Sequence, residues 1–147
     1  MAHLRRSLRI STTELWLLVK ATLLLEAIKL GMQLLPFRAL RRLLDRVAGT
    51  FAGWRDTSCP SVNKIAWVIE TASRHTPGAK SCLNQALAAQ VMLTRGGYPS
   101  QLHIGVAKGE QGQFKAHAWV ESEGRVVIGG SQLGGFTPLT VLEREGL

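Results

Sequence analysis

The chain is poor in cysteine and in long uninterrupted apolar runs, and each shortage excludes a class of protein. Its two cysteines, Cys59 and Cys82, lie 23 residues apart outside any CxxC pattern. This spacing argues against a disulfide scaffold or a zinc ribbon and suits a reducing cytoplasm, where we expect the protein to work. The first apolar stretch is interrupted by Lys20, Glu26 and Lys29. Because charges are costly at the centre of a bilayer, we expect a helix that touches a membrane surface at most and does not cross it.

Acidic residues are also scarce, and the imbalance is concentrated at one end of the chain. The formal net charge is +8, with 18 Lys and Arg against 10 Asp and Glu. Residues 1–50 hold nine of the basic residues against three acids, whereas residues 51–147 hold nine against seven. A basic segment suits nucleic acid, anionic lipid, an acidic peptide or simply a solvated helix face. Because neither an aromatic stacking platform nor a recognised nucleic-acid motif accompanies it, we do not expect nucleic acid as a partner.

Helical patterns dominate the first two thirds of the sequence. Ser11 and Glu14 match a capping box, which predicts a helix from there to about Leu35, where Pro36 stops it. Apolar residues cover more than one face of this helix, so we expect most of it to be buried. Three further helices are expected at Phe37–Val47, Ser61–His75 and Cys82–Arg95, the last with Ser81 as N-cap and Gly96-Gly97 after it.

Alternating patterns follow and predict a small antiparallel sheet. Strands are expected at Gln101–Ala107, Phe114–Glu121 and Val126–Ile128, the last two joined by a hairpin turn. Helices followed by such a sheet indicate the α+β class. We expect residues 1–58 to form a basic, amphipathic helical segment packed on a core of residues 59–147, most simply as one compact domain.

Cys82 is the strongest candidate for chemistry. If Ser81 is the N-cap, the thiol lies in the first turn of a helix, where unpaired N–H groups and the positive end of the dipole favour a thiolate. Lys80 adds a nearby cation, and the Cys82 backbone N–H is a candidate donor to an oxyanion. The competing interpretation is a small buried apolar residue. Cys59 is followed by Pro60 and has no comparable helix start, so we do not expect it to be the nucleophile.

A histidine on the neighbouring sheet would serve as the base, and two compete for that role. A hairpin centred near Glu110 predicts that His103 and His117 lie opposite each other on adjacent strands, so spacing alone does not choose between them. Either is also explained as a hydrogen-bonded structural residue. The spacing of these cysteines and histidines matches no zinc pattern, and we expect neither a metal nor a cofactor.

The residue that should orient the imidazole is not identified. The strand after His117 contains no carboxylate, and Glu121, four residues further along an extended chain, lies too far away for a direct bond unless the strand bends. Ser131 or Gln132 are weaker substitutes. Trp119 is expected either to wall a cleft or to belong to the core.

Two segments carry a family resemblance: SCLNQALAAQVMLTRGGYPSQLHIGV, beginning at Ser81, and AHAWVESEGRVVIGG, beginning at Ala116. With the surrounding Ser61–Leu142, they resemble the bacterial transglutaminase-like leader peptidases of lasso-peptide biosynthesis. The resemblance implies a papain- or transglutaminase-like cysteine protease fold, with Cys82 as nucleophile and His117 as base. The aspartate usual in that family would fall near Gly129, where this chain has none.

The resemblance also implies a pathway and its partners. The expected activity is removal of the leader from a ribosomally made precursor, before a separate ATP-dependent cyclase of the asparagine-synthetase type closes the macrolactam. A small partner protein is expected to bind the leader by strand addition. The N-terminal helices are candidates for docking that partner, the cyclase or a membrane surface. A catalytically weak or inactive binding module in the same complex is the alternative, and a transglutaminase acting on amines would use the same pair of residues.

Overall fold

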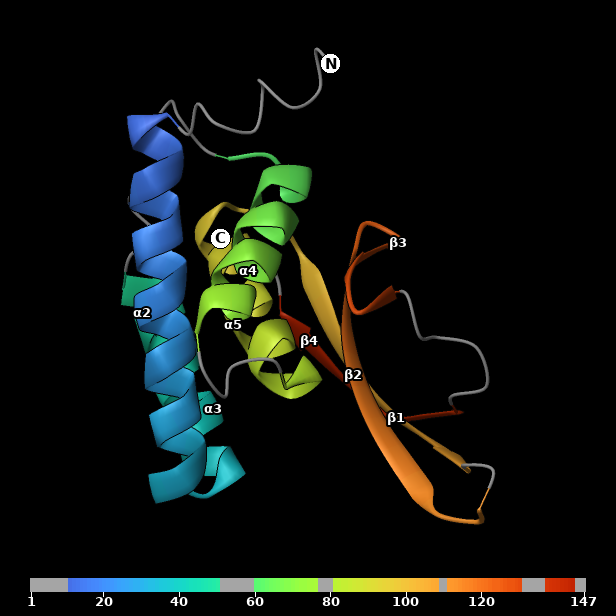
Figure 1. The fold of residues 1–147 in the computed structure, drawn as a ribbon. Helices are drawn as coiled ribbons and strands as arrows, with labels where there is room; N and C mark the ends of the chain where they lie inside the picture. The colour runs from blue at the N-terminus through green and yellow to red at the C-terminus, as the bar shows by residue number, and fades with distance from the viewer. Residues whose placement is uncertain (1–10, 51–59, 77–80, 109–110, 131–136, 145–147) are drawn as a thin grey trace.

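In the computed structural model, helices pack on one face of an antiparallel sheet, which confirms the expected α+β class (Figure 1). The structure describes residues 11–50, 60–76, 81–108, 111–130 and 137–144. The helices in these ranges are α2 (Thr12–Leu34), α3 (Phe37–Thr50), α4 (Val62–His75) and α5 (Cys82–Arg95). The strands are β1 (Ser100–Lys108), β2 (Phe114–Ser122), β3 (Arg125–Ile128) and β4 (Thr137–Arg144), in the order β3-β2-β1-β4.

Helix α2 begins and ends as its sequence predicts. The Ser11 side chain accepts a hydrogen bond from the Glu14 amide, and the Glu14 carboxylate accepts one from the Ser11 amide, which completes the capping box. The expectation that most of α2 is buried is wrong. Only one face is covered, because α2 packs against α4 and α5 on one side and lies outermost in the helical layer. Within the described residues, none of the helices has the length and apolarity needed to cross a bilayer.

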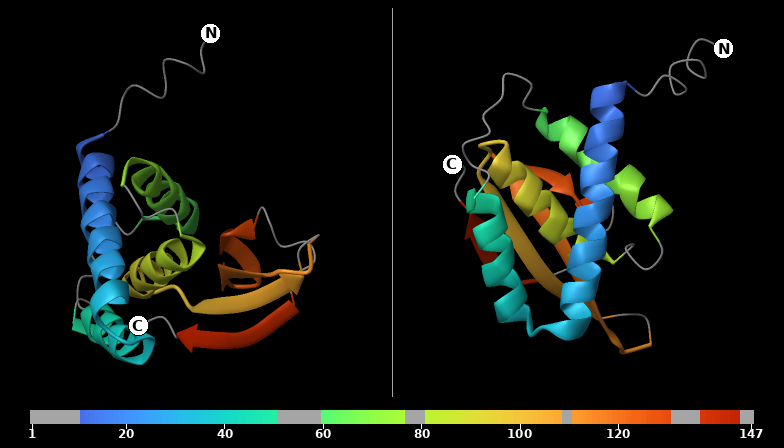
Figure 2. Two further views of the ribbon diagram at one scale, coloured as in Figure 1. Left: turned by 60° about the horizontal axis from the view of Figure 1, so that its bottom comes forward. Right: turned by 90° about the vertical axis from the view of Figure 1, so that its left-hand side faces the viewer.

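The three other expected helices are confirmed, and they carry the core. Ser61 caps α4, and an apolar stripe at spacings of three and four residues is buried along this helix, formed by Ile65, Val68, Ile69 and Ala72. Helix α5 lies between the outer helices and the sheet and contacts both (Figure 2). Ser81 stands at the N-cap position of α5, but its side chain makes no capping hydrogen bond, which differs from the expectation. Gly97, with a φ of 82°, ends the helix as predicted.

The hairpin of β1 and β2 forms, but its predicted register is wrong. His103 pairs with Trp119, and Gly105 pairs with His117, so the two histidines are diagonal neighbours instead of directly opposite each other. The last pair is Lys108 with Phe114, which centres the connection one residue later than expected. This register sets Leu102 opposite Val120, and both side chains are fully buried in the core.

Strand β4 was not expected from the sequence. It pairs antiparallel with β1, with a register shift between Ile104 and Gly105. Pro138 stands opposite Gly105 in this strand. A proline cannot donate to a ladder, so it lowers the strand signal of its segment, but an edge strand tolerates it. Within the part of the chain that the structure describes, the sheet therefore has four strands instead of the three expected.

The Glu14 carboxylate also joins α2 to α4, and this link predicts a pH-dependent stability. It forms an ion pair and hydrogen bond with Lys64, and these bonds together with the Ser11 amide lower the pKa of Glu14 below its ordinary value. A lowered pKa means that the stabilisation is present above the unfolded-state pKa and is lost as pH falls through the folded-state pKa. We therefore expect Glu14→Gln to lower the melting temperature at neutral pH but not in strong acid, where the wild-type carboxyl is protonated.

Glutamine still bonds the Ser11 amide, so this variant removes the charge and leaves the cap. Glu26→Gln is the matched control, because Glu26 pairs with Lys29 on the surface of the same helix at 2.8 Å. At neutral pH it should lower the melting temperature less than Glu14→Gln does. If the melting temperatures of wild type and Glu14→Gln differed by the same amount at neutral pH and in strong acid, the Glu14 carboxylate would not be the source of the pH dependence.

Gly129, directly after β3, predicts a large effect of adding a single methyl group. Its φ is 85°, and a Cβ there would lie 2.8 Å from the Ala118 carbonyl oxygen and 2.9 Å from Trp119 Cβ. We expect Gly129→Ala to lower the free energy of unfolding by roughly 2–4 kcal/mol, from backbone strain and overpacking together.

Gly124, in the β2–β3 turn, provides the matched control. It has a similar φ of 78°, but nothing lies within 4 Å of the position of a Cβ. Gly124→Ala should therefore cost only the backbone term, about 1 kcal/mol. Equal losses for the two variants in chemical denaturation would show that the close approach to β2 is not significant.

Candidate functional site

Cys82 is the first residue of α5, and its side chain faces the helical side of the sheet. It is partly buried and packs against the hydrophobic core, as do Leu83 and Ile104. Because the Ser81 hydroxyl does not cap the helix, it does not occupy the first-turn N–H groups. These amides, including that of Cys82, are therefore compatible with the predicted role as oxyanion donors. Lys80 and Cys59 lie outside the described residues.

The two histidines lie on the other face of the sheet. Side chains alternate along β2, so Ala118 and Val120 enter the core that the helices cover, whereas His117 and Trp119 point away from it. The Trp119 ring stacks on His103 at a centroid distance of 5.2 Å and on His117 at 6.1 Å. The three rings form a continuous stack, in which Trp119 is the middle member and is 5 % exposed.

A backbone carbonyl orients His117. Its Nε2 lies 2.8 Å from the Gly129 oxygen. A carbonyl only accepts hydrogen bonds, so Nε2 carries the proton, and a neutral imidazole in this tautomer has Nδ1 as its acceptor nitrogen. Gly129 is the position near which the resemblance would place an aspartate. Sequence reasoning considered side chains for the third member and therefore missed a main-chain group, which no residue type signals.

Glu121 interacts with the other two rings of the stack. Its carboxylate accepts a hydrogen bond from Trp119 Nε1 at 3.3 Å and lies 3.4 Å from His103 Nε2. The latter contact has the distance of an ion pair but not the alignment of a hydrogen bond, so it becomes attractive when His103 is protonated. Ser131 and Gln132, the weaker substitutes, lie outside the described residues.

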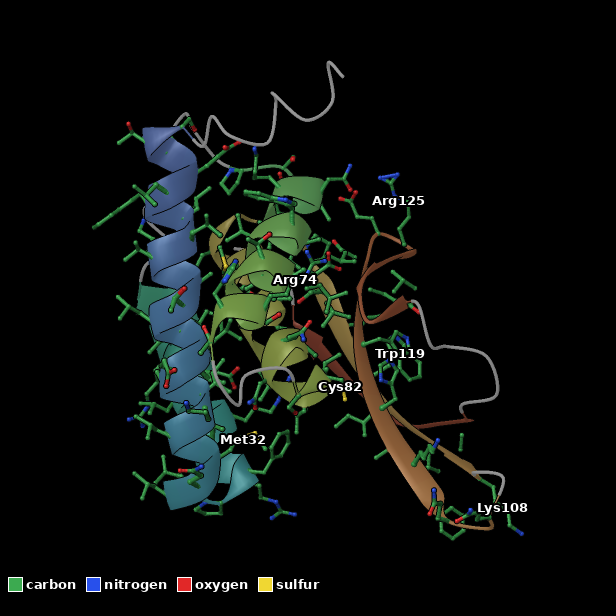
Figure 3. The ribbon with its side chains drawn as sticks, in the orientation of Figure 1. Met32, Arg74, Cys82, Lys108, Trp119 and Arg125 are labelled. Carbon is green, nitrogen blue, oxygen red and sulfur yellow. The ribbon has the colours of Figure 1, made fainter. Side chains whose placement is uncertain are left out.

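The structure does not bring the predicted nucleophile and base onto one face. Figure 3 shows Cys82 on the helical side of β2 and Trp119 on the opposite side, and His117 shares the side of Trp119. Strand β2 itself lies between these two positions. Among the described residues, β3 pairs with Val120, Glu121 and Ser122 of β2, so the preceding part of that strand is paired through β1.

Metal binding was the competing use of these side chains. In the ranges that the structure describes, no group of three or more His, Cys, Asp or Glu side chains is arranged to hold an ion. His103 and Glu121 are near each other on the outer face, but Cys82 lies on the helical side.

Comparisons with known proteins identify the family. The sequence profile of the Transglutaminase-like superfamily matches residues 23–141, which include both Cys82 and His117. No curated protein and no solved structure matches the chain. This superfamily commonly contains cysteine proteases and transglutaminases. With most of its length covered by the match, and with a cysteine opening a helix that packs on a histidine-bearing antiparallel sheet, the chain belongs to the transglutaminase-like superfamily.

Proposed function

We propose that the protein is a cysteine peptidase that removes the leader from a ribosomally synthesised lasso-peptide precursor before macrolactam formation. The observation that carries the proposal is the position of Cys82 at the start of α5, within the region that the superfamily profile matches. A thiol at the start of a helix has both the activating environment and the amide donors that acyl transfer requires. The strand that carries His117 packs against the same helix.

The proposed reaction has two steps. The Cys82 thiolate attacks the peptide carbonyl at the leader–core junction, and first-turn amides, including the Cys82 N–H, stabilise the oxyanion. His117 takes the thiol proton and gives it to the leaving amine of the core peptide as the C–N bond breaks. Water then attacks the thioester with His117 as base, which releases the leader with a carboxylate and regenerates the thiol.

The hydrogen bond from His117 to Gly129 supports the choice of base. In papain-like chemistry a third group holds the imidazole in one tautomer, and a carbonyl can do so without a charge. The 2.8 Å bond leaves Nδ1 as the acceptor nitrogen that would receive the thiol proton. Because a neutral carbonyl stabilises an imidazolium less than a carboxylate does, we expect slower turnover than with a complete triad.

Turnover by this pair requires the thiol and the imidazole to meet, although they start on opposite faces of β2. We propose that the segment Phe114–Ala118 twists to bring them together. The first part of this segment is exposed from Phe114 to Ala116 and, among the described residues, is paired through β1 alone, so few contacts oppose movement at that end. The twist also has to break the hydrogen bond from His117 to Gly129 and withdraw Ala118 from the core. Binding of an extended peptide along this edge of β2 would supply new main-chain hydrogen bonds and favour the rearranged state.

The proposed function requires several partners. The chain acts in the cytoplasm on the precursor leader, together with a small leader-binding protein that presents it and alongside the ATP-dependent macrolactam cyclase. Neither a metal nor a cofactor takes part in the proposed steps.

Cleavage of a precursor tests the proposal directly. The protein is incubated with a lasso-type precursor and its leader-binding protein, and the products are measured by mass spectrometry. Wild type should release the intact leader, while Cys82→Ala and His117→Ala should each lower the rate at least about 100-fold, because one removes the nucleophile and the other the proton carrier.

Cys59→Ser and His103→Ala are the controls for these two substitutions. The first should leave the rate unchanged, and the second should lower it less than His117→Ala, because His103 contacts the stack but takes no part in the proposed steps. Unchanged cleavage by Cys82→Ala would refute the peptidase assignment. Incorporation of an amine without hydrolysis would show a transglutaminase instead.

A second candidate function is a non-catalytic binding module in the same maturation complex. The positions of Cys82 and His117 on opposite faces of β2 favour it, as does the lack of an acidic residue in the sequence of β3. On this alternative, the fold holds the leader or a partner and another protein performs the cleavage.

Cross-linking distinguishes the two candidates. In a Cys59→Ser background, His117→Cys places a second thiol at the position of the imidazole, and a disulfide with Cys82 forms only if the two residues approach. We expect mild oxidation in the presence of leader peptide to join residues 82 and 117, detected as a linked peptide after digestion. A variant in which both thiols stay reduced, combined with a wild type that cleaves nothing, would establish the binding module.

A further inference from the structure

The outer face of α2 carries an exposed apolar stripe. We call it the outer stripe. Its members are Trp16 (59 % exposed), Val19 (42 %), Leu23 (65 %), Leu30 (52 %) and Leu34 (78 %). Spacings of three, four and seven residues place them on one side of the helix. The stripe extends for roughly 27 Å, at about 1.5 Å per residue.

The opposite side of the same helix is fully buried. Ala21, Leu25 and Ile28 have no exposed surface and belong to the hydrophobic core. A helix that covers a core normally presents polar residues to solvent, whereas α2 is apolar on both sides. A continuous exposed apolar surface of this kind marks a place where another surface binds.

Positive charges beside the outer stripe indicate what that surface is. Lys20 lies next to it, with its Nζ 5.4 Å from the centre of the Trp16 ring. Helix α3 runs beside α2 in the outer layer (Figure 2). It exposes Arg38, Arg42 and Arg46, at intervals of four residues. An apolar ridge flanked by cations matches the boundary between the anionic headgroups and the acyl chains of a membrane. A second copy of the chain would instead bring more cations of the same kind to this surface.

We propose that the outer stripe and the exposed arginines of α3 dock the protein on an anionic membrane surface. The axis of α2 lies parallel to that surface, with the apolar side chains at the level of the acyl boundary and the guanidinium groups among the headgroups. The helical layer then faces the membrane, and the sheet with His117 faces away from it (Figure 1). This inference does not depend on the proposed peptidase activity.

Vesicle flotation with the full chain tests the proposal. Phosphatidylcholine vesicles with and without phosphatidylglycerol are compared at fixed lipid concentration, and bound protein is quantified by gel. We expect binding to the anionic vesicles and at least tenfold weaker binding to the neutral ones. Leu23→Glu, which places a charge in the middle of the stripe, should lower the anionic partition coefficient at least tenfold.

Two further variants separate the apolar and the electrostatic contributions. Val126→Glu adds the same charge at a residue that is 39 % exposed on β3, away from the helical layer, and should bind almost as wild type does. Arg38→Gln together with Arg42→Gln should lower partition by roughly fivefold for each arginine. Circular dichroism of every variant checks that its fold is retained.

Equal binding to the two kinds of vesicle, or undiminished binding by Leu23→Glu, would overturn the proposal. A wild type that stays off vesicles but forms a dimer in light scattering, with Leu23→Glu monomeric, would assign the stripe to a second copy and overturn it as well.

Discussion

Burial of α5 between the outer helices and the sheet is the constraint on which the rest of the structure depends. The helix contacts α2, α3, α4 and three strands, and nine of its fourteen residues are buried. Ala86, Ala88 and Ala89 permit close approach on several sides because their side chains are short. The buried amide of Gln90 accepts a hydrogen bond from Arg41 at 3.1 Å, which ties α3 to α5 without leaving that acceptor unsatisfied.

This central position determines what the thiol can reach. Because α5 packs flat on β1 and β2, its first residue meets the face of β2 that carries Ala118 and Val120. The period of two along a strand then sends His117 to the other face. Core packing and assembly of a thiol–imidazole pair therefore compete within the same strand. The contacts of the core are far more numerous, and they set the resting arrangement.

The fold could be predicted from the sequence wherever one local pattern decided the structure. The capping box of Ser11 and Glu14 and the buried stripe of α4 are signals of this type, and both are present in the structure. The predictions failed where contacts between segments distant in the chain determine the structure. The exposure of α2 depends on which elements cover it, and β4 combines a proline with a partner more than thirty residues earlier.

In the candidate site, too, local patterns could be predicted and features set by distant partners could not. The position of Cys82 at a helix start follows from nearby residues alone, whereas the facing of His117 follows from hairpin register and from the face that α5 covers. A two-residue error in register leaves the facing of each histidine unchanged, because side chains alternate with a period of two. The expectation that a histidine faces Cys82 therefore failed because the helices cover the other face of the sheet. The sequence of no single segment determines which face is covered.

The strand order has a consequence for how the chain folds during synthesis. Strand β1 lies between β2 and β4, and β4 is the last element of the described chain to leave the ribosome. Until then the inner strand exposes one row of unpaired amides and carbonyls, although the helices and the first hairpin can already be in place. Completion of the sheet is thus a late, long-range step, and a nascent chain paused before residue 137 presents β1 as an open edge to other chains.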